Sequence, residues 1–399
     1  MRNAVRVVGI LSAAGIVLGA CSSSPSTGNT GTSSTNGNSG TSSTATPAGG
    51  SFNACEVTDT GGINDRSFNA SAYAGLLAAK AVDSKIVPHF LSSTSSSAYT
   101  PNINTFLGQN CGIIITVGFD MGTSTSTAAK AHPSQKFGIV DFAYSPTIPN
   151  VLGLTYQTNQ DAFLGGYLAA AMATTNSIAS GGAVGTFGGQ NIPPVTIYMD
   201  GWVAGVRYYD QLNNKTVKAL GWYPTAGNRA AGTFNGTGSF TNDFVDQTKG
   251  ETTTKALISQ GASVIFPVAG SVGLGAAAAV KAAASKVLME WVDTDGFVSA
   301  PADQTLFITS VEKGITTSVK DAVLAAVNGS FKGGLYVGTL ANGGVALAPY
   351  HDFASTIPAA VQTEITSLTT KVESGAVSVD PCKYPAAAAT PSGHSTCGA

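Results

Sequence analysis

From Cys55 onward, short apolar runs alternate with longer, helix-like segments that are rich in alanine. The short runs predict strands at Cys55–Thr58, Ile86–Leu91, Gly112–Val117, Phe137–Phe142, Val151–Thr155, Ala183–Phe187, Ser263–Val268, Val287–Val292 and Thr305–Ser310. The longer segments predict helices at Ser67–Val82, Asp161–Ala173, Val195–Leu212, Thr252–Gln260 and Leu274–Ala284. A repeated strand-then-helix order is typical of parallel sheets built from βαβ units. Over about 350 residues, this rhythm predicts two doubly wound α/β lobes rather than one sheet.

In a parallel α/β sheet, ligands bind at the C-terminal ends of the strands. Carboxylates, aromatic rings and one lysine recur directly after the predicted strands. The residues at these positions are Asp59, Gly118-Phe119-Asp120, Asp141, Phe266 to Gly270, Asp293 to Asp295, and Ser310 to Lys313. A flat ligand that carries hydroxyl groups suits this set.

The N-terminal residues follow a different pattern. Arg2 and Arg6 precede an apolar run that is too short to cross a bilayer, so residues 1–20 predict an export signal. The run closes on Leu-Gly-Ala-Cys21, which is similar to the lipobox of bacterial lipoproteins and implies lipid attachment at Cys21 on the outer face of the cytoplasmic membrane. A secreted protein with a chance cysteine is the alternative. Residues 21–50 are mostly Ser, Thr, Gly, Asn and Pro and predict a flexible tether.

Four further cysteines are available for disulfides, which an exported protein is expected to form. They allow three pairings. Cys55 opens the first predicted strand and Cys111 immediately precedes the third, and these two strands often lie side by side in a doubly wound sheet. We therefore predict a Cys55–Cys111 disulfide, with Cys382–Cys397 closing the C-terminal tail.

Composition and spacing argue against several classes of function. The formal net charge is −2, so neither nucleic acid nor an anionic membrane surface is favoured as a partner. The four histidines are scattered without metal-ligand spacing, and no GxSxG elbow is present. The glycine-rich run at 269–275 invites a dinucleotide-binding interpretation, but its spacing is not GxGxxG, and a tight turn or close ligand approach explains it equally well.

The loop DTGGINDRSFN after the first strand is more informative. Its two glycines permit a turn with positive φ, and Asn64 or Asp65 can cap the following helix, which is the interpretation we favour for Asp65. Phe68 then lies in the first helical turn of a polar loop. The core-facing positions of this helix are expected to be Tyr73, Leu76, Leu77 and Val82, so Phe68 is available for another role.

Five blocks of the sequence follow one another along the chain: DTGGINDRSFNASAYAGL, QDAFLGGYLAAAMA, GAVGTFGGQNIPPVTIYMDGWVAGVRYY, ASVIFPVAGSVGLGAAAAV and FITSVEKG. They resemble, in the same order, blocks of the basic membrane protein (BMP) family of substrate-binding lipoproteins, which includes a purine nucleoside receptor. The resemblance implies a type I periplasmic-binding-protein fold with a ligand cleft between two lobes. The expected lobes are 51–155 with about 310–345, and 156–309 with about 346–370, followed by a tail at 371–399.

The same resemblance implies roles for individual residues. Asp59 would bond the edge of a purine, and Phe68 and Phe266 would enclose the base between two rings. The ribose hydroxyls would be held by Asp141, Asp293 and Lys313, with Asn64 and the backbone of Gly270 as further contacts. This chain departs from the family at VDTDG, where VDxDQ is usual, in the glycine-rich stretch after Gly221, and in the tail beyond Pro349.

The function implied is that of a monomeric, lipid-anchored solute-binding protein that captures a purine nucleoside and delivers it to the permease and ATPase of an ABC transporter. No cofactor, metal or catalytic residue is expected. The alternatives are a binding lipoprotein for a sugar or another small heterocycle, a sensory or surface lipoprotein without a transporter, and a nucleoside-processing enzyme.

Overall fold

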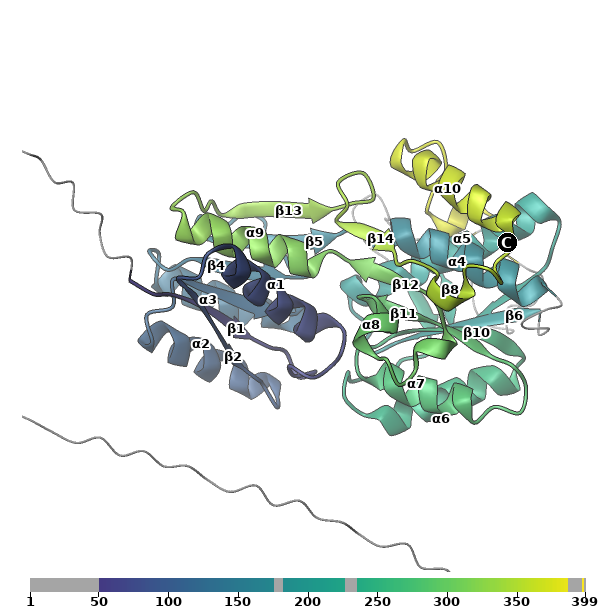
Figure 1. Ribbon diagram of the computed structural model, residues 1–399, viewed down its shortest axis with the longest axis horizontal. Coiled ribbons are helices and arrows are strands. Elements are labelled where there is room, and N and C mark those ends of the chain that lie inside the picture. Colours follow the sequence, from purple (N-terminus) through teal and green to yellow (C-terminus); the bar gives the residue numbers. More distant parts are fainter. Residues whose placement is uncertain (1–49, 176–181, 227–234, 387–396, 398–399) are drawn as a thin grey trace, which may run out of the picture. The chain divides into compact units, whose positions relative to one another are not determined.

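The structure, a computed structural model, describes residues 50–175, 182–226, 235–386 and 397 (Figure 1). The chain divides into two units, 1–48 and 49–399, and all described residues belong to the second. The predicted export signal and Cys21 lie outside the described residues, as does the predicted tether up to residue 49. None of the described helices is long and apolar enough to span a bilayer.

The first lobe is a six-stranded sheet with helices on both faces (Figure 1). Its strands pair in parallel in the order β13-β5-β4-β3-β1-β2. They are β1 (Phe52–Val57), β2 (Ile86–Leu91), β3 (Ile113–Val117), β4 (Phe137–Val140), β5 (Val151–Tyr156) and β13 (Gly334–Gly338). One face packs against α1 (Phe68–Val82) and α9 (Ile315–Val327), and the other against α2 (Tyr99–Gly108) and α3 (Gly122–Ala131).

The second lobe repeats this plan, with the strand order β14-β12-β11-β10-β6-β7. Its strands are β6 (Ala183–Gly188), β7 (Lys218–Leu220), β10 (Ala262–Val268), β11 (Leu288–Asp293), β12 (Phe307–Lys313) and β14 (Val345–Leu347), of which β14 is antiparallel. One face packs against α4 (Asn159–Thr174) and α5 (Pro193–Asn213), and the other against α6 (Gln247–Ser259) and α7 (Val272–Lys281). A hairpin, β8 (Trp222–Pro224) with β9 (Gly236–Gly238), and the helices α8 (Gly296–Ser299) and α10 (Ala359–Glu373) complete it.

Three segments cross between the lobes. The chain passes from β5 to α4, returns from β12 to α9, and passes from β13 to β14. The predicted pair of doubly wound α/β lobes is therefore confirmed, and β1 and β3 are neighbours as predicted.

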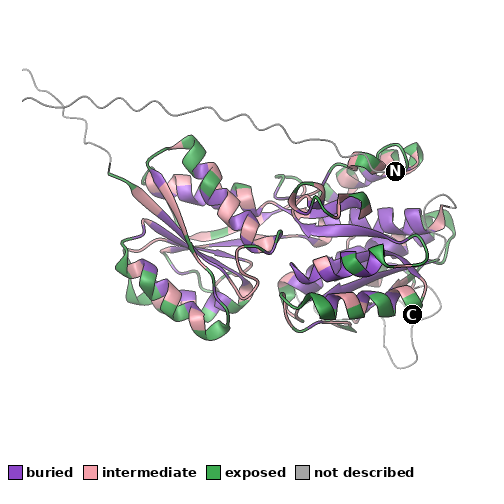
Figure 2. Ribbon diagram, turned by 60° about the horizontal axis from the view of Figure 1, so that its bottom comes forward, coloured by how far each residue is buried: buried purple, intermediate pink, exposed green. Residues whose placement is uncertain are grey.

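The buried residues form the strands and the inner helix faces of both lobes, as Figure 2 shows. In α1 the prediction of the core face is partly wrong, because Leu77 and Val82 are 48% and 68% exposed, whereas Leu76 is fully buried. The helix packs on α9 through a stripe of small residues around Gly75, where an added Cβ would lie 2.8 Å from the carbonyl oxygen of Thr316. The packed face of α1 is therefore the face whose small residues let the two helix backbones approach closely, and not the face with the larger side chains.

Glycines also bring α4 and α5 into backbone contact. An added Cβ at Gly166 would lie 1.9 Å from the carbonyl oxygen of Trp202, and one at Gly205 would lie 1.9 Å from that of Phe163. Nearly every residue of α4 is buried, between the sheet, α5 and α10. A helix that is apolar on all sides is expected in such a central position.

The core of the second lobe holds a carboxyl group, that of Glu290 on β11. Its Oε2 accepts a bond of 2.7 Å from the indole nitrogen of Trp202, and its Oε1 has no partner among the described residues. Burial raises the pKa of Glu290 to about 8, and the hydrogen bond from Trp202 opposes this shift. The folded protein therefore holds this proton at pH values where the unfolded chain has released it.

We expect the Glu290→Gln substitution to flatten the pH dependence of stability. Because the folded pKa is raised, the contribution of Glu290 is fully present below about pH 4.5 and is lost as pH rises through about 8. The variant should gain up to a few kcal/mol over the native chain at pH 8.5 and little at pH 5, measured by urea unfolding. Glu251→Gln on the exposed face of α6 is the control, and it should leave the free energy of unfolding unchanged at both pH values. An unchanged pH profile for Glu290→Gln would contradict the expectation.

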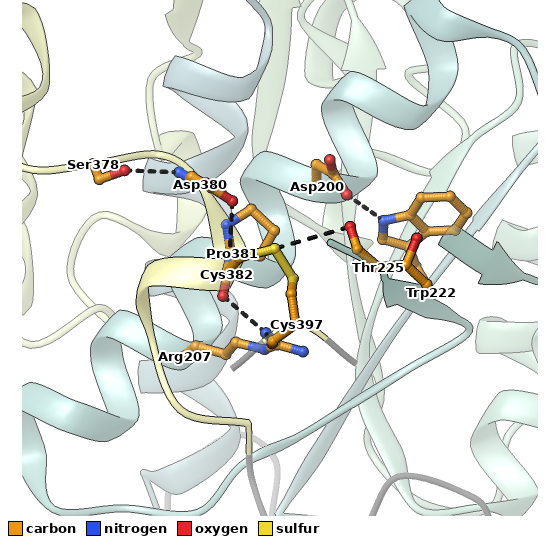
Figure 3. Close-up of a disulfide and its surroundings, with 9 residues drawn as sticks. All are labelled: Asp200, Arg207, Trp222, Thr225, Ser378, Asp380, Pro381, Cys382 and Cys397. Atoms are coloured by element: carbon orange, nitrogen blue, oxygen red, sulfur yellow. Dashed lines mark hydrogen bonds between the residues drawn. A yellow bond between two sulfur atoms is a disulfide. The ribbon is translucent and has the colours of Figure 1, made fainter. Parts of the chain in front are cut away.

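Both predicted disulfides are confirmed, Cys55–Cys111 and Cys382–Cys397. Figure 3 shows the second, which links two points of the C-terminal tail to each other. The buried guanidinium of Arg207 on α5 donates from Nη1 to the carbonyl oxygens of Pro381 (2.8 Å) and Cys397 (2.9 Å). The backbone N–H of Cys397 donates to the carbonyl of Pro224 on β8. These hydrogen bonds hold the tail against α5 and join Cys397 to the β8–β9 hairpin.

Candidate functional site

A cavity lies where the C-terminal strand ends of the two lobes face each other. The space between its walls, including the part open to solvent, is about 580 Å³. It is lined by Asp59, Gly61, Asp65, Phe68, Asn69, Gly118, Phe119, Asp120, Asp141, Ile192, Pro194, Val195, Tyr198, Phe244, Val268, Ala269, Gly270, Asp293 and Lys313. Six of the eight predicted ligand-binding residues line this cavity; five of them lie at strand ends, and Phe68 lies at the start of α1.

Asp59 presents one free carboxylate oxygen to the cavity. Its Oδ1 accepts bonds from the backbone N–H of Gly61 (2.8 Å) and the side-chain amide of Asn69 (2.7 Å). Its Oδ2 accepts none from the described residues and lies beside Gly118, where an added Cβ would be 3.1 Å away. Burial raises the pKa of Asp59 to about 7, opposed by the Asn69 and Gly61 bonds and assisted by the carboxyl groups of Asp65 and Asp120. The group can therefore accept or donate a hydrogen bond near neutral pH.

Asp65 caps α1, as we favoured from the sequence. Its Oδ1 accepts from the backbone N–H groups of Ser67 (3.1 Å) and Ala70 (3.0 Å), and its Oδ2 accepts from that of Asn69 (2.7 Å). These bonds satisfy the free N–H groups that every helix start leaves. The cap fixes the turn that carries Asp59 and Phe68 to the cavity.

A second polar group of the cavity is centred on Lys313, at the end of β12. Its Nζ lies 2.7 Å from Oδ2 of Asp141 in the first lobe and 3.4 Å from Oδ1 of Asp293 in the second. Burial lowers the pKa of Lys313, but the two carboxylates outweigh it and raise the pKa above its usual value. Burial raises the pKa of Asp141 to about 6 although Lys313 opposes the shift, so the pair is ionised at neutral pH. Oδ1 of Asp141 accepts no bond from the described residues and can receive a ligand hydroxyl.

The two aspartates occupy equivalent places in the two lobes. Asp141 follows β4 and Asp293 ends β11, and both strands are third from one edge of their sheets. Both residues have a left-handed backbone, with φ of 64° and 69°. Aspartate tolerates this conformation better than most residues, so the same turn aims both carboxylates at Lys313.

Aromatic rings from both lobes line the cavity. Phe68, at the start of α1, is half-buried, and its ring centroid lies 5.0 Å from Nζ of Lys313. Phe244, in the loop before α6, is half-buried and lines the cavity from the second lobe. Each lobe therefore contributes a ring to the wall. The sequence analysis missed Phe244, because no periodicity marks a loop residue.

The predicted role of Phe266 must be corrected. Its ring is fully buried and does not line the cavity; it stacks on Trp202 (centroids 6.0 Å apart) and meets the ring of Tyr198 edge-on. The side of β10 that carries Phe266 faces α5 in the core, and the cavity begins only at Val268. Asn64 is also not at the cavity, because its side chain is exposed outside the turn.

Other lining residues were not predicted as ligand contacts. Tyr198, on α5, donates from its hydroxyl to Oδ1 of Asp293 (3.1 Å), although it lies in a helix that the sequence marked only as apolar. Asp120, in a 3₁₀ turn after β3, was noted as a strand-end residue but given no role. Its position in the cavity follows from the strand-end rule alone.

Packing accounts for the glycine-rich run at 269–275. Gly270 lines the cavity with a positive φ of 54°, as expected of a tight turn. An added Cβ at Gly275 would lie 1.8 Å from the carbonyl oxygen of Gln247, so this glycine lets α7 touch α6. Within the described residues, no three His, Cys, Asp or Glu side chains are grouped so as to hold a metal ion.

Comparison with known proteins agrees with this architecture. Residues 52–230 and 237–373 match the family model for "ABC transporter substrate-binding protein PnrA-like". The "ABC transporter nucleoside-binding protein BmpA" of Lactococcus lactis subsp. cremoris is 29% identical over 87% of this chain and 91% of its own length.

Two solved solute-binding proteins of ABC transporter systems share the fold. The one from Aeropyrum pernix K1 has a TM-score of 0.70 and 23% identity, covering 82% of this chain and 92% of its own. The one from Conexibacter woesei has a TM-score of 0.62 and 20% identity, covering 82% and 98%. The predicted type I periplasmic-binding-protein fold is thereby confirmed, and these relatives are binding proteins rather than enzymes. The chain belongs to the PnrA-like family of ABC transporter substrate-binding proteins.

Proposed function

We propose that the protein captures a purine nucleoside in the cavity between its lobes and delivers it to the permease of an ABC transporter. The observation that carries this proposal is the composition of the cavity wall. Aromatic rings from both lobes lie in the same cavity as a carboxylate with one free oxygen and a separate Lys–Asp–Asp group. A relative of this chain is named as a nucleoside-binding protein, which supports the same ligand class.

The parts of a nucleoside match the parts of the wall. The flat base stacks on Phe68 and Phe244, and stacking on an aromatic ring contributes about 1–3 kcal/mol per base. Oδ2 of Asp59 accepts from an N–H on the edge of the base. The ribose hydroxyls bond with Asp141 and Lys313, and a deoxy analogue leaves a buried acceptor unpaired at a cost of about 1–3 kcal/mol.

The cellular setting of the proposal follows from the N-terminal residues. Lipid at Cys21 anchors the protein, as a monomer, on the outer face of the cytoplasmic membrane. The tether that follows leaves the folded unit free to turn toward a permease. Closure of the lobes around the ligand produces the shape that the permease recognises.

Calorimetric titration tests the ligand class. We expect binding of guanosine, inosine and adenosine, weaker binding of their 2′-deoxy analogues, and no measurable binding of free ribose. Incubation with each nucleoside should yield no product. Binding of a free sugar with no response to any nucleoside would overturn the proposal.

The Asp59→Asn substitution tests the orientation of the base. Guanosine and inosine carry an N–H at ring position 1 that donates to an ionised carboxylate, so in the native protein their affinity should rise as pH increases from 5.5 to 8. The reason for the sign is that binding favours the ionised form of a group whose pKa is about 7. In the variant the pH dependence should be weaker, with the contribution of Asp141 remaining, and affinity at pH 8 should fall about tenfold or more, because bonds to charged groups contribute about 1.5–3 kcal/mol. A parallel pH profile in both proteins would place the base elsewhere.

A further inference from the structure

We infer that Ser67 is a positioning residue that couples closure of the two lobes to the shape of the binding site. Ser67 belongs to the first lobe, in the turn between β1 and α1, and is fully buried. Its hydroxyl crosses to the second lobe, where it lies 3.0 Å from the carbonyl oxygen of Val292 and 2.9 Å from Oδ2 of Asp293. Its proton therefore lies between two acceptors of the opposite lobe.

Ser67 directly precedes α1, but its hydroxyl does not cap that helix. A serine directly before a helix usually caps that helix with its hydroxyl. Here the Ser67 hydroxyl makes no capping bond, and Asp65 bonds the first N–H groups of α1 instead. Because Asp65 already accepts bonds from the first N–H groups of α1, the Ser67 hydroxyl is available for the contact between the lobes.

Two further bonds join the same turn to the second lobe. The indole nitrogen of Trp291 donates to the carbonyl oxygen of Arg66 (3.3 Å), and Nη1 of Arg66 donates to the carbonyl oxygen of Ser299 (3.1 Å). Arg66 has a φ of 57°, a left-handed conformation that costs an arginine free energy. The bonds between the lobes and the Asp65 cap hold this turn in place.

The Ser67 contact completes the environment of a carboxylate in the binding site. Oδ1 of Asp293 receives the hydroxyl of Tyr198 and the ammonium of Lys313, both from the second lobe. Among the residues that the structure describes, Oδ2 accepts a hydrogen bond only from Ser67, in the first lobe. The orientation of Asp293 is therefore complete only when the lobes are closed. Ser67 itself does not line the cavity, so it acts through Asp293 and through closure rather than by touching the ligand.

The consequence for binding rests on the proposed function, whereas the consequence for closure does not. Without the Ser67 hydroxyl the closed state loses a buried hydrogen bond, so the ligand-free protein opens more often. A ligand that requires the closed state then binds more weakly by the same factor, whichever nucleoside it is, since the loss lies in the conformational equilibrium. Most of the change should appear in the dissociation rate.

The test compares Ser67→Ala with Ser71→Ala, a matched control. Ser71 is also a buried serine of this region, but its hydroxyl donates to the carbonyl oxygen of Ser67, within the first lobe. Hydrogen exchange of the ligand-free proteins is followed at 118–120 and 268–270, which line the cavity from the two lobes. We expect faster exchange in both segments for Ser67→Ala and not for Ser71→Ala. Equal exchange in the two variants would overturn the proposal, even if no nucleoside binds.

Affinity measurements on the same variants form the second arm. For Ser67→Ala we expect guanosine, inosine and 2′-deoxyguanosine to bind about three- to tenfold more weakly, all by one common factor. Arg66→Met, at an exposed position where folding is not at risk, should shift exchange and affinity in the same direction by a smaller factor. A loss confined to ribonucleosides would mean that Ser67 affects ribose recognition alone, and would overturn its coupling to lobe closure.

Discussion

Replacing Lys313 by methionine should cause a large loss of stability, because it leaves two carboxylates buried without their cation. The ammonium lies between Asp141 and Asp293, and the side chains of all three residues are at least nine-tenths buried. Removing one partner of a buried ion pair typically costs about 3–5 kcal/mol. We expect a loss of this size in urea unfolding at pH 7, together with the loss of ligand binding.

The pH dependence separates this mechanism from simple loss of packing. Without Lys313 the carboxylates take up protons more readily, so part of the lost stability should return as pH falls from 7 to 5. The double variant Lys313→Met with Asp141→Asn should be more stable at pH 7 than Lys313→Met alone, because it removes one uncompensated charge. Lys281→Met is the control; the side chain of Lys281 is 46% exposed, so loss of its ion pair with Asp303 should change stability by less than about 1 kcal/mol. A pH-independent loss for Lys313→Met would argue against the charge mechanism.

The strand-end rule predicted most of the site because it depends only on topology. Parallel strands end at one edge of a sheet, so Asp59 and Asp141 had to lie together once the strands were identified. The same holds for Asp293 and Lys313 in the second lobe. The pairing of Cys55 with Cys111 followed from the same strand order.

The errors have a different physical origin. Every residue of β10 is buried, so no alternation of polar and apolar residues shows which side chains face α5 and which face outward. Phe266 could therefore not be distinguished from a cavity residue by its sequence, and Phe244 lies in a loop without periodicity. In α1 the packed face is marked by small residues around Gly75, whereas the larger Leu77 is exposed.

Ser67 shows how a tertiary contact can replace a local rule. A serine directly before a helix commonly caps that helix, and capping depends only on neighbours along the chain. The contact that the structure shows is with Asp293, which is 226 residues away. The sequence analysis missed the short edge strands β13 and β14 for a related reason. They lie in a glycine-rich stretch, and their pairing partners come from distant parts of the chain.

Replacing Phe68 by alanine should weaken nucleoside binding about 5- to 150-fold, which corresponds to the loss of one stacking surface. The ring lines the cavity, but one side of it also packs against the core between the sheet and α9. We therefore expect a loss of stability as well, of about 1–2 kcal/mol, less than for a fully buried phenylalanine. Calorimetric titration and urea unfolding measure the two effects separately.

Phe68→Leu separates stacking from packing, because leucine keeps an apolar side chain on the core but has no flat face. We expect its stability to be close to that of the native protein and its affinity for guanosine to be nearly as low as that of Phe68→Ala. Tyr73→Ala, which removes another half-buried ring of α1 outside the cavity, should leave affinity unchanged. If the leucine variant binds guanosine as tightly as the native protein, Phe68 contributes only apolar contact, and the stacked base must rest on Phe244 instead.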